Sequence, residues 1–168
     1  EMVRAARAGD VSLVGELLGR GADVNAKVLL GNGLGTAISE SAAGGFSNII
    51  QLLVSAGAEV NLIDNNGWTA LMSAHGAVVI RTLVDAGADV DAMDVNGWTA
   101  LMLLDDPDLV DVLLEEGAGI DTENSYGWTA LMWAAFSGLS DKVDLLLKNG
   151  ADIELRDNQG RTSLMVAY

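Results

Sequence analysis

The sequence predicts an all-α solenoid in which short helix-turn-helix units stack on one another. The first supporting observation is a repeated heptapeptide: NGWTALM occurs at residues 66–72 and 96–102, followed by YGWTALM at 126–132 and QGRTSLM at 159–165. The second is a series of Gly-Ala motifs (GADVN, GAEVN, GADVD, GAGID and GADIE) that begin at residues 21, 57, 87, 117 and 150. The shared threonine stands at 36, 69, 99, 129 and 162, so successive copies are 33, 30, 30 and 33 residues apart.

Each unit is expected to hold two helices. The first begins at the T-A-L-M motif and the second ends at the Gly-Ala pair. Segments such as NIIQLLVSAG and DKVDLLLKNG place apolar residues three and four positions apart, which marks one face of a helix. The glycine that follows fits a left-handed helix cap. Helices of about ten residues are marginal alone, so we expect neighbouring units to stack and bury a shared face.

Five units follow one another along the chain. Residues 2–25 begin partway into a first helix, 36–61 and 129–154 are full-length helix pairs, and 69–91 and 99–121 are each three residues short. About one helical turn is missing between the helices of each short unit. In the second of them, we expect Asp106 to cap a helix that has Pro107 in its first turn.

The C-terminal residues begin a sixth unit. Leu164, Met165 and Val166 would need a second helix to cover them, and the chain stops at Tyr168. We therefore expect residues 1–168 to be a single repeat domain that is a fragment of a longer chain.

The motifs and their spacing resemble the ankyrin-repeat family, with a period near 33 and a T-P-L-H-x-A pattern. The resemblance implies an ankyrin-repeat solenoid of L-shaped units, each with a β-hairpin finger that projects from an antiparallel helix pair. The fingers here are DNNGW, DVNGW, NSYGW and DNQGR, in which Asn-Gly suits a tight turn. Methionine replaces the family's histidine at residues 72, 102, 132 and 165, so we expect the stack to depend on apolar burial more than on polar bracing.

The composition excludes several classes of partner. The net charge of −15 repels phosphate backbones, so we do not expect a nucleic-acid partner. No apolar run approaches the length of about 20 residues that spans a membrane, so no membrane insertion is expected. The chain has no cysteine, which excludes thiolate metal sites and leaves the compartment open. We expect an intracellular, cytoplasmic location.

No motif indicates catalysis or a cofactor. His75 is the one histidine and is interpreted as a polar loop residue, so neither a general base nor a zinc site is predicted. GNGLG at residues 31–35 has glycine spacing without the lysine of a phosphate-binding loop, and we interpret it as a flexible turn. The family resemblance implies that Asn25 and Asn61 stand where an asparaginyl hydroxylase can act; the alternative is a structural role in the turn. We predict a protein that is not an enzyme.

The residue after the finger glycine is tryptophan in three fingers: Trp68, Trp98 and Trp128, with Arg161 in the fourth. In the ankyrin-repeat family, which the chain resembles, this position faces the concave surface that binds ligands. Two interpretations are open: the indoles brace neighbouring fingers, or they form an aromatic strip that contacts a partner. Tyr126 at a fingertip is a further contact candidate, and Trp133 either extends the strip or belongs to the core.

Charge supports the partner interpretation. From residue 82 to 141 there are thirteen acidic residues and no lysine or arginine. Asp64 and Asp94, on fingers beside tryptophans, are the acids expected to pair with a basic partner whose cations sit on the indole faces. The predicted function is a non-catalytic protein-binding module that binds a basic segment through its concave finger and inner-helix surface. An acidic inhibitor or immunity-type protein that blocks a basic enzyme, and a substrate-recruiting domain of a larger enzyme, are the alternatives.

Overall fold

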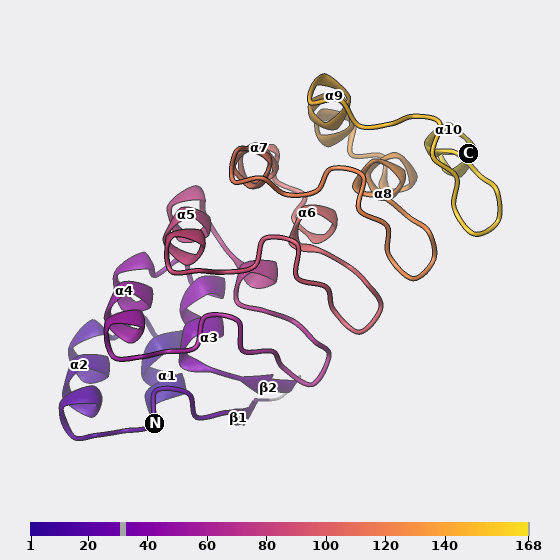
Figure 1. The fold of residues 1–168 in the computed structure, drawn as a ribbon. Coiled ribbons are helices and arrows are strands. Elements are labelled where there is room, and N and C mark those ends of the chain that lie inside the picture. Colours follow the sequence, from indigo (N-terminus) through magenta and orange to yellow (C-terminus); the bar gives the residue numbers. More distant parts are fainter. Residues whose placement is uncertain (31–32, 168) are drawn as a thin grey trace. The chain divides into compact units, whose positions relative to one another are not determined.

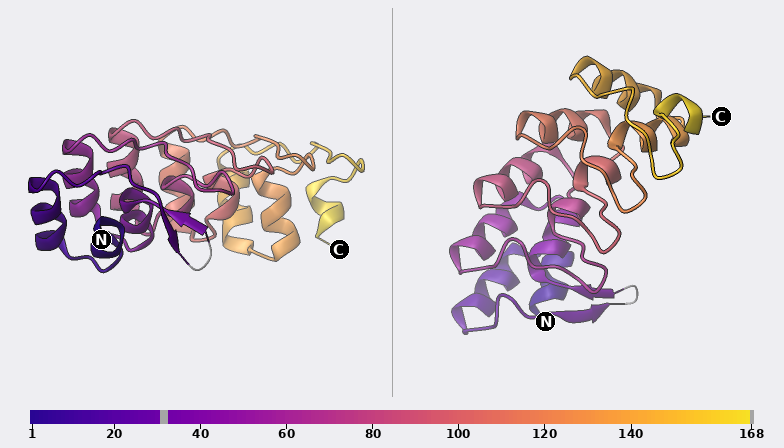
Figure 2. Two further views of the ribbon diagram at one scale, coloured as in Figure 1. Left: turned by 90° about the horizontal axis from the view of Figure 1, so that it is seen from below. Right: turned by 45° about the vertical axis from the view of Figure 1, so that its right-hand side comes forward.

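The structure, a computed structural model, describes residues 1–30 and 33–167. The chain divides into two compact units, Glu1–Asp89 and Val90–Tyr168. Each unit is built from short helices connected by loops, which Figures 1 and 2 show in three views. The prediction of a single domain over residues 1–168 stays a prediction.

The first unit holds two rows of helices. Its elements are α1 (Met2–Arg7), α2 (Val11–Gly19), β1 (Val28–Leu30), β2 (Gly33–Gly35), α3 (Ala37–Ala43), α4 (Ser47–Ser55), the 3₁₀ helix η1 (Leu71–Ser73) and α5 (Ala77–Asp85). In the inner row α1 packs on α3 and α3 packs on η1, and in the outer row α2 packs on α4 and α4 on α5. This is the stacking of helix pairs that the repeat predicts.

The second unit repeats the same arrangement. Its elements are α6 (Ala100–Leu103), α7 (Pro107–Glu115), α8 (Ala130–Ser137), α9 (Ser140–Lys148) and α10 (Ser163–Val166). The inner helices α6, α8 and α10 pack in succession, and the outer helices α7 and α9 pack on each other. Among the described helices none is long and apolar enough to cross a membrane.

The apolar face of each helix forms the core, as its three- and four-residue spacing predicts. Ile49, Ile50 and Leu53 of α4 are fully buried, and so are the inner-helix methionines Met102 and Met132, at 2% exposure or less. Methionine at the family's histidine position therefore packs in the core in these repeats. In the last repeat Met165 is 55% exposed, so the expectation of apolar burial is wrong there.

Side chains and glycines cap the helix ends, and the predicted cap at Asp106 is confirmed. Thr36 and Thr129 cap α3 and α8 through their side chains, and Asp106 caps α7 with Pro107 in the first turn. The glycines of the Gly-Ala motifs have φ between +76° and +92°, the left-handed conformation expected after each outer helix.

Inner helices are shortened in the two short repeats. The element η1 has three residues and α6 has four, whereas α3 has seven and α8 has eight. The loss leaves the last carbonyl groups of α6 without helical partners, because the turn that would have bonded to them is missing.

Lys142 of α9 bonds to these carbonyl groups. Its Nζ donates hydrogen bonds to the carbonyl oxygens of Met102 (3.0 Å) and Leu104 (2.8 Å), and it lies 3.4 Å from Oδ1 of Asp105. The Lys142 side chain is 0% exposed. Burial lowers the pKa of Lys142, and the charge and hydrogen bond of Asp105 oppose that shift. The sequence alone predicts no role for this lysine.

The segment before Thr36 differs from its prediction. Residues 33–35 of the GNGLG motif form a strand and not the predicted flexible turn: β1 and β2 form an antiparallel pair in which Leu29 lies opposite Leu34. The pairing is supported from the next finger, since Leu34 N donates to Asn65 Oδ1 (3.1 Å). Gly31 and Asn32, part of the glycine motif, lie outside the described residues. This is the one strand pair in the described part of the chain.

The asparagines of the Gly-Ala motifs connect successive repeats. Oδ1 of Asn25 accepts a hydrogen bond from Glu59 N (2.9 Å), and Oδ1 of Asn61 accepts one from Asp89 N (2.9 Å). Asp91 and Asp121 make the same kind of bond further along the chain. The residue at this position therefore has a structural role in the turn. Hydroxylation of Asn25 or Asn61 stays a prediction.

Candidate partner-binding surface

Four fingers, residues 64–68, 94–98, 124–128 and 157–161, have the same internal hydrogen bonds. In each, the side chain of the first residue accepts bonds of 2.7–3.0 Å from the backbone N–H groups two and four positions later. The first residues are Asp64, Asp94, Asn124 and Asp157. The main chain closes each finger again, for example from Asp94 N to Trp98 O (2.9 Å). The loop is too short for a strand ladder, so the β-hairpin implied by the family is reduced here to a closed turn.

Asp64 and Asp94 therefore shape the fingers that carry them. One carboxylate oxygen of each is engaged by its own backbone. Both residues are half-buried and not fully exposed. Their predicted pairing with a basic partner stays a prediction, and it would involve the remaining oxygen.

The second unit gathers four aromatic rings, here called the aromatic cluster: Trp98, Trp128, Trp133 and Phe136. The ring of Trp133 meets Trp98 edge-on at 4.9 Å, and Phe136 meets Trp128 edge-on at 5.2 Å. Trp133 also lies 6.2 Å from Trp128, so it connects the two finger indoles. The three tryptophans are half-buried and Phe136 is 58% exposed.

A hollow of about 330 Å³ opens beside this cluster. Trp98, Trp128 and Trp133 line it together with Tyr126, which is 56% exposed. The remaining lining residues are Asn158, Gln159 and Arg161. Of the predicted contact residues of the second unit, Trp98, Tyr126, Trp128 and Arg161 line this one hollow. Asp94 does not line it.

Asp157 and Arg161 fix the position of Trp128. Oδ2 of Asp157 accepts hydrogen bonds from Trp128 Nε1 (3.1 Å) and Arg161 Nε (2.8 Å). The Arg161 guanidinium lies 5.8 Å from the centre of the Trp128 ring, and its Nη2 is 2.6 Å from the same carboxylate oxygen. Arg161 is therefore paired within the protein and packs on the indole face.

The environment of the Asp157 carboxyl sets its charge. Burial raises the pKa of this carboxyl. Hydrogen bonds from the Arg161 side chain and from the backbone of Arg161 and Gln159, together with the guanidinium charge, lower the pKa by more than burial raises it. The resulting pKa is about 2, so the carboxyl is ionised at neutral pH.

Trp68 belongs to the first unit. It is 37% exposed and lines a hollow of about 250 Å³ with Arg7, Glu40 and Asp64. The Arg7 guanidinium lies 3.5 Å from the Glu40 carboxylate there.

Sequence analysis missed three members of the site. Phe136 stands three residues after Trp133, so helical spacing alone places the two rings on one face of α8. Asp157 occupies the finger position that Asp64 and Asp94 mark. Asn124 is the exception at that position, and its importance appears only with the side-chain bonds in view.

Within residues 1–30 and 33–167, no group of three or more histidine, cysteine, aspartate or glutamate side chains could hold a metal ion. His75 is exposed, and its backbone N donates to Ala42 O (3.0 Å).

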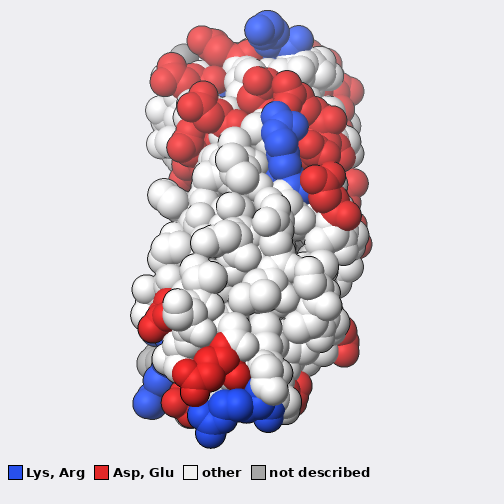
Figure 3. All heavy atoms as spheres, turned by 90° about the vertical axis from the view of Figure 1, so that its left-hand side faces the viewer, with Lys and Arg blue, Asp and Glu red and all other residues white. Residues whose placement is uncertain are grey.

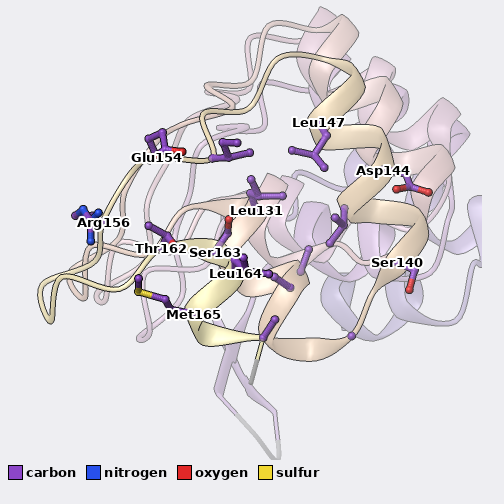
Figure 4. A pocket seen from close by; sticks show the side chains of 16 residues that line it. Leu131, Ser140, Asp144, Leu147, Glu154, Arg156, Thr162, Ser163, Leu164 and Met165 are labelled. Carbon is purple, nitrogen blue, oxygen red and sulfur yellow. The ribbon is translucent and has the colours of Figure 1, made fainter.

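A second, more apolar hollow of about 670 Å³ lies among α8, α9 and α10. Figure 4 shows Leu131, Leu147 and Leu164 around it, with Asp144 and Glu154 toward its edges. Leu164 is 68% exposed, whereas Val166 is buried. That a second helix covers these residues stays a prediction, and Val166 is buried without one.

Acidic residues dominate the charge of the chain, with 24 Asp and Glu against 9 Lys and Arg. On the face that Figure 3 shows, acidic side chains gather in groups and a broad area carries no charge. The charge is therefore unevenly distributed over that face.

Comparison with known proteins agrees with this architecture. The family model for ankyrin repeats (3 copies) matches residues 2–94 and 98–168. A search of curated proteins found no match. Ankyrin repeats generally mediate protein–protein interactions and are typically non-catalytic. The predicted fold class is confirmed, and the chain belongs to the ankyrin-repeat family.

Proposed function

We propose that the chain is a non-catalytic protein-binding module whose aromatic cluster binds a basic segment of its partner. The observation that carries the proposal is the cluster itself. Trp98, Trp128, Trp133 and Phe136 are grouped on fingers and an inner helix beside an open hollow, with Tyr126 at its rim. Tryptophan and tyrosine dominate the residues that contribute most to binding at protein interfaces.

A contact within the chain supports recognition of a cation by this cluster. The Arg161 guanidinium already packs on the Trp128 face at 5.8 Å. The indole face of this site therefore accepts a guanidinium group, and the partly exposed rings beside it offer the same chemistry to a partner's arginine or lysine.

The charge of the chain favours a basic partner. A net charge of −15 attracts basic segments and accelerates their encounter with the surface, an effect that salt weakens. The acidic charge also suits the alternative of an inhibitor that covers a basic active cleft, which differs from a scaffold in abolishing its partner's activity.

Rigidity of the fingers also supports binding at this place. Ser125 N donates to Asn96 O (3.0 Å), and Asn158 N donates to Tyr126 O (3.1 Å), so three fingers are hydrogen-bonded in series. A surface that is ordered before binding loses little entropy on association.

The test uses a displayed library of linear peptides selected on the wild-type protein. Selected peptides should be rich in arginine and lysine, and their affinity should fall as salt is raised. Changing Trp98→Ala or Tyr126→Ala should weaken binding by about 2 kcal/mol, or roughly 30-fold. Leu29→Ala is the matched control, because Leu29 is 79% exposed and lies on β1 in the other unit.

Two results would contradict the proposal. One is the enrichment of neutral or acidic peptides whose affinity is independent of salt. The other is an equal loss of affinity in Leu29→Ala and in the two aromatic variants, provided that all three unfold at the wild-type temperature.

A further inference from the structure

Two junctions between fingers in the second unit are built alike. At the first, Asn96 O accepts a hydrogen bond from Ser125 N, and at the second Tyr126 O accepts one from Asn158 N. The finger glycines also approach the next finger equally closely. A Cβ on Gly97 would lie 2.9 Å from the next finger's backbone, and one on Gly127 would lie 2.8 Å away. The first residue of each later finger therefore stands at the same backbone position in the two junctions.

That first side chain differs between the two junctions. At the second it is Asp157, whose Oδ2 accepts the hydrogen bond of Trp128 Nε1 (3.1 Å). At the first it is Asn124, which is 6% exposed and whose Nδ2 has no hydrogen-bond partner in the structure. Trp98 Nε1 likewise makes no hydrogen bond within the described part of the chain.

The orientation of the Asn124 amide is fixed. Its Oδ1 accepts hydrogen bonds from Tyr126 N (2.9 Å) and Trp128 N (3.0 Å). Exchanging the amide oxygen and nitrogen would set Nδ2 against two N–H donors, so Nδ2 must occupy the position that Oδ2 has in Asp157. At the first junction, a donor therefore stands at the position from which the Asp157 carboxylate accepts the Trp128 indole bond at the second.

We propose that Asn124 is a specificity-determining residue that leaves the Trp98 indole N–H available to a partner. Trp98 Nε1 then donates its hydrogen bond to a main-chain carbonyl oxygen of the bound segment, beside the basic side chain that packs on the cluster. A carbonyl is favoured over a carboxylate because the net charge of −15 repels an acidic ligand. This inference rests on the proposed function and adds the polar contact that positions the segment.

The first experiment needs no partner. Exchange of the Trp98 and Trp128 indole Hε1 protons with solvent is followed by NMR on ¹⁵N-labelled protein. Trp98→Phe and Trp128→Phe identify these two signals among those of the four tryptophans. In the wild type the Trp128 proton should exchange slowly and the Trp98 proton rapidly. In Asn124→Asp the new carboxylate accepts the Trp98 bond, and the Trp98 proton should become slow. Slow exchange of the Trp98 proton in the wild type would overturn the inference.

The second experiment measures binding of a peptide selected from the displayed library. Asn124→Asp should lower its affinity roughly tenfold, which is the effect of about one hydrogen bond. Trp98→Phe, which keeps a ring and removes the N–H, should lower it by a similar factor. Combining the two changes should add nothing further, because both remove the same contact.

Three outcomes are distinguishable. Equal losses that add in the double variant, or no loss in Asn124→Asp, would overturn the inference and leave the proposed function standing. A library that yields no binder sensitive to Tyr126→Ala would refute the proposed function, and the inference with it. If Asn124→Asp does not fold, the Trp98→Phe variant still decides the matter, since undiminished affinity would exclude the indole N–H as a donor to the ligand.

Discussion

Replacement of Lys142 by methionine tests how the shortened repeat is held together. Lys142→Met keeps an unbranched side chain of similar length and removes the ammonium group. Its loss leaves Met102 O and Leu104 O without the donor that now lies 3.0 and 2.8 Å away. Because the chain offers no other helical turn at this point, the end of α6 should be weakened.

The magnitude follows from what each carbonyl group loses. A buried carbonyl without a donor costs about 1–3 kcal/mol, and this applies to Met102. The carbonyl of Leu104 should cost less, because Leu104 is half-buried and water can reach it in part. Removing a buried ammonium offsets some of this cost, as the lowered pKa of Lys142 indicates. We expect a net loss of about 2 kcal/mol in the free energy of unfolding, or a fall of roughly 6 °C in melting temperature.

Urea unfolding followed by circular dichroism measures this change. Lys148→Met is the matched control, because Lys148 ends the same helix and is exposed, so its replacement should change stability by less than about 0.5 kcal/mol. A Lys142→Met protein as stable as the wild type, or more stable, would refute the reasoning. It would mean that burying the charge costs as much as the hydrogen bonds contribute.

The difference in the free energy of unfolding between the wild type and Lys142→Met should depend on pH. Since the pKa of Lys142 lies below 10.5 in the folded state, the unfolded state binds more protons between the two pKa values. The wild-type free energy of unfolding should therefore rise relative to that of Lys142→Met as pH increases toward 10.5. A difference that is constant with pH would contradict the assignment.

Three further predictions concern the second unit. Because the pKa of Asp157 is lowered to about 2, its contribution to stability is present above pH 3.8 and is lost as pH falls toward 2. Acid unfolding should show this loss of stability in the wild type and not in Asp157→Asn. Parallel unfolding curves for the two proteins would contradict the prediction. Gly97→Ala should destabilise the protein by at least about 1 kcal/mol more than Gly117→Ala. Both glycines have positive φ, but only at Gly97 would the new Cβ lie within 3.0 Å of another finger's backbone. Equal shifts in melting temperature would show that this backbone does not approach Gly97 closely. Exchanging Leu164 and Met165 for glutamine should change the melting temperature little, because both are more than half exposed, and a large fall would show that they contribute to a core.

The repeat, its helix boundaries and its caps could be predicted because they depend on residues close to one another in the sequence. Period, apolar spacing and residue type act within a few positions of one another, as the capping of α7 by Asp106 illustrates. The loss of three residues between the helices of two repeats was visible for the same reason. Pairing of β1 with β2 was not, since it depends on support from the finger at residues 64–68.

The candidate site was only partly visible. Trp98, Trp128 and Tyr126 stand out as unusual residues at repeated positions, and the structure places them beside one hollow. The acceptor of the Trp128 indole N–H could not be predicted, because Asp157 belongs to a finger about 30 residues away. Lys142 was missed because its bonds cross 38 and 40 residues.

The contact of Lys142 with α6 has a consequence for the ways in which this array could be rearranged. The repeat that starts at Thr99 completes its inner helix with an atom from the following outer helix. Duplicating or transplanting that repeat alone would leave its last carbonyl groups unbonded, so the exchangeable segment is the pair of repeats that runs from α6 to α9. An engineer who shuffles modules of this protein should cut before Thr99 or after Lys148, and not between them.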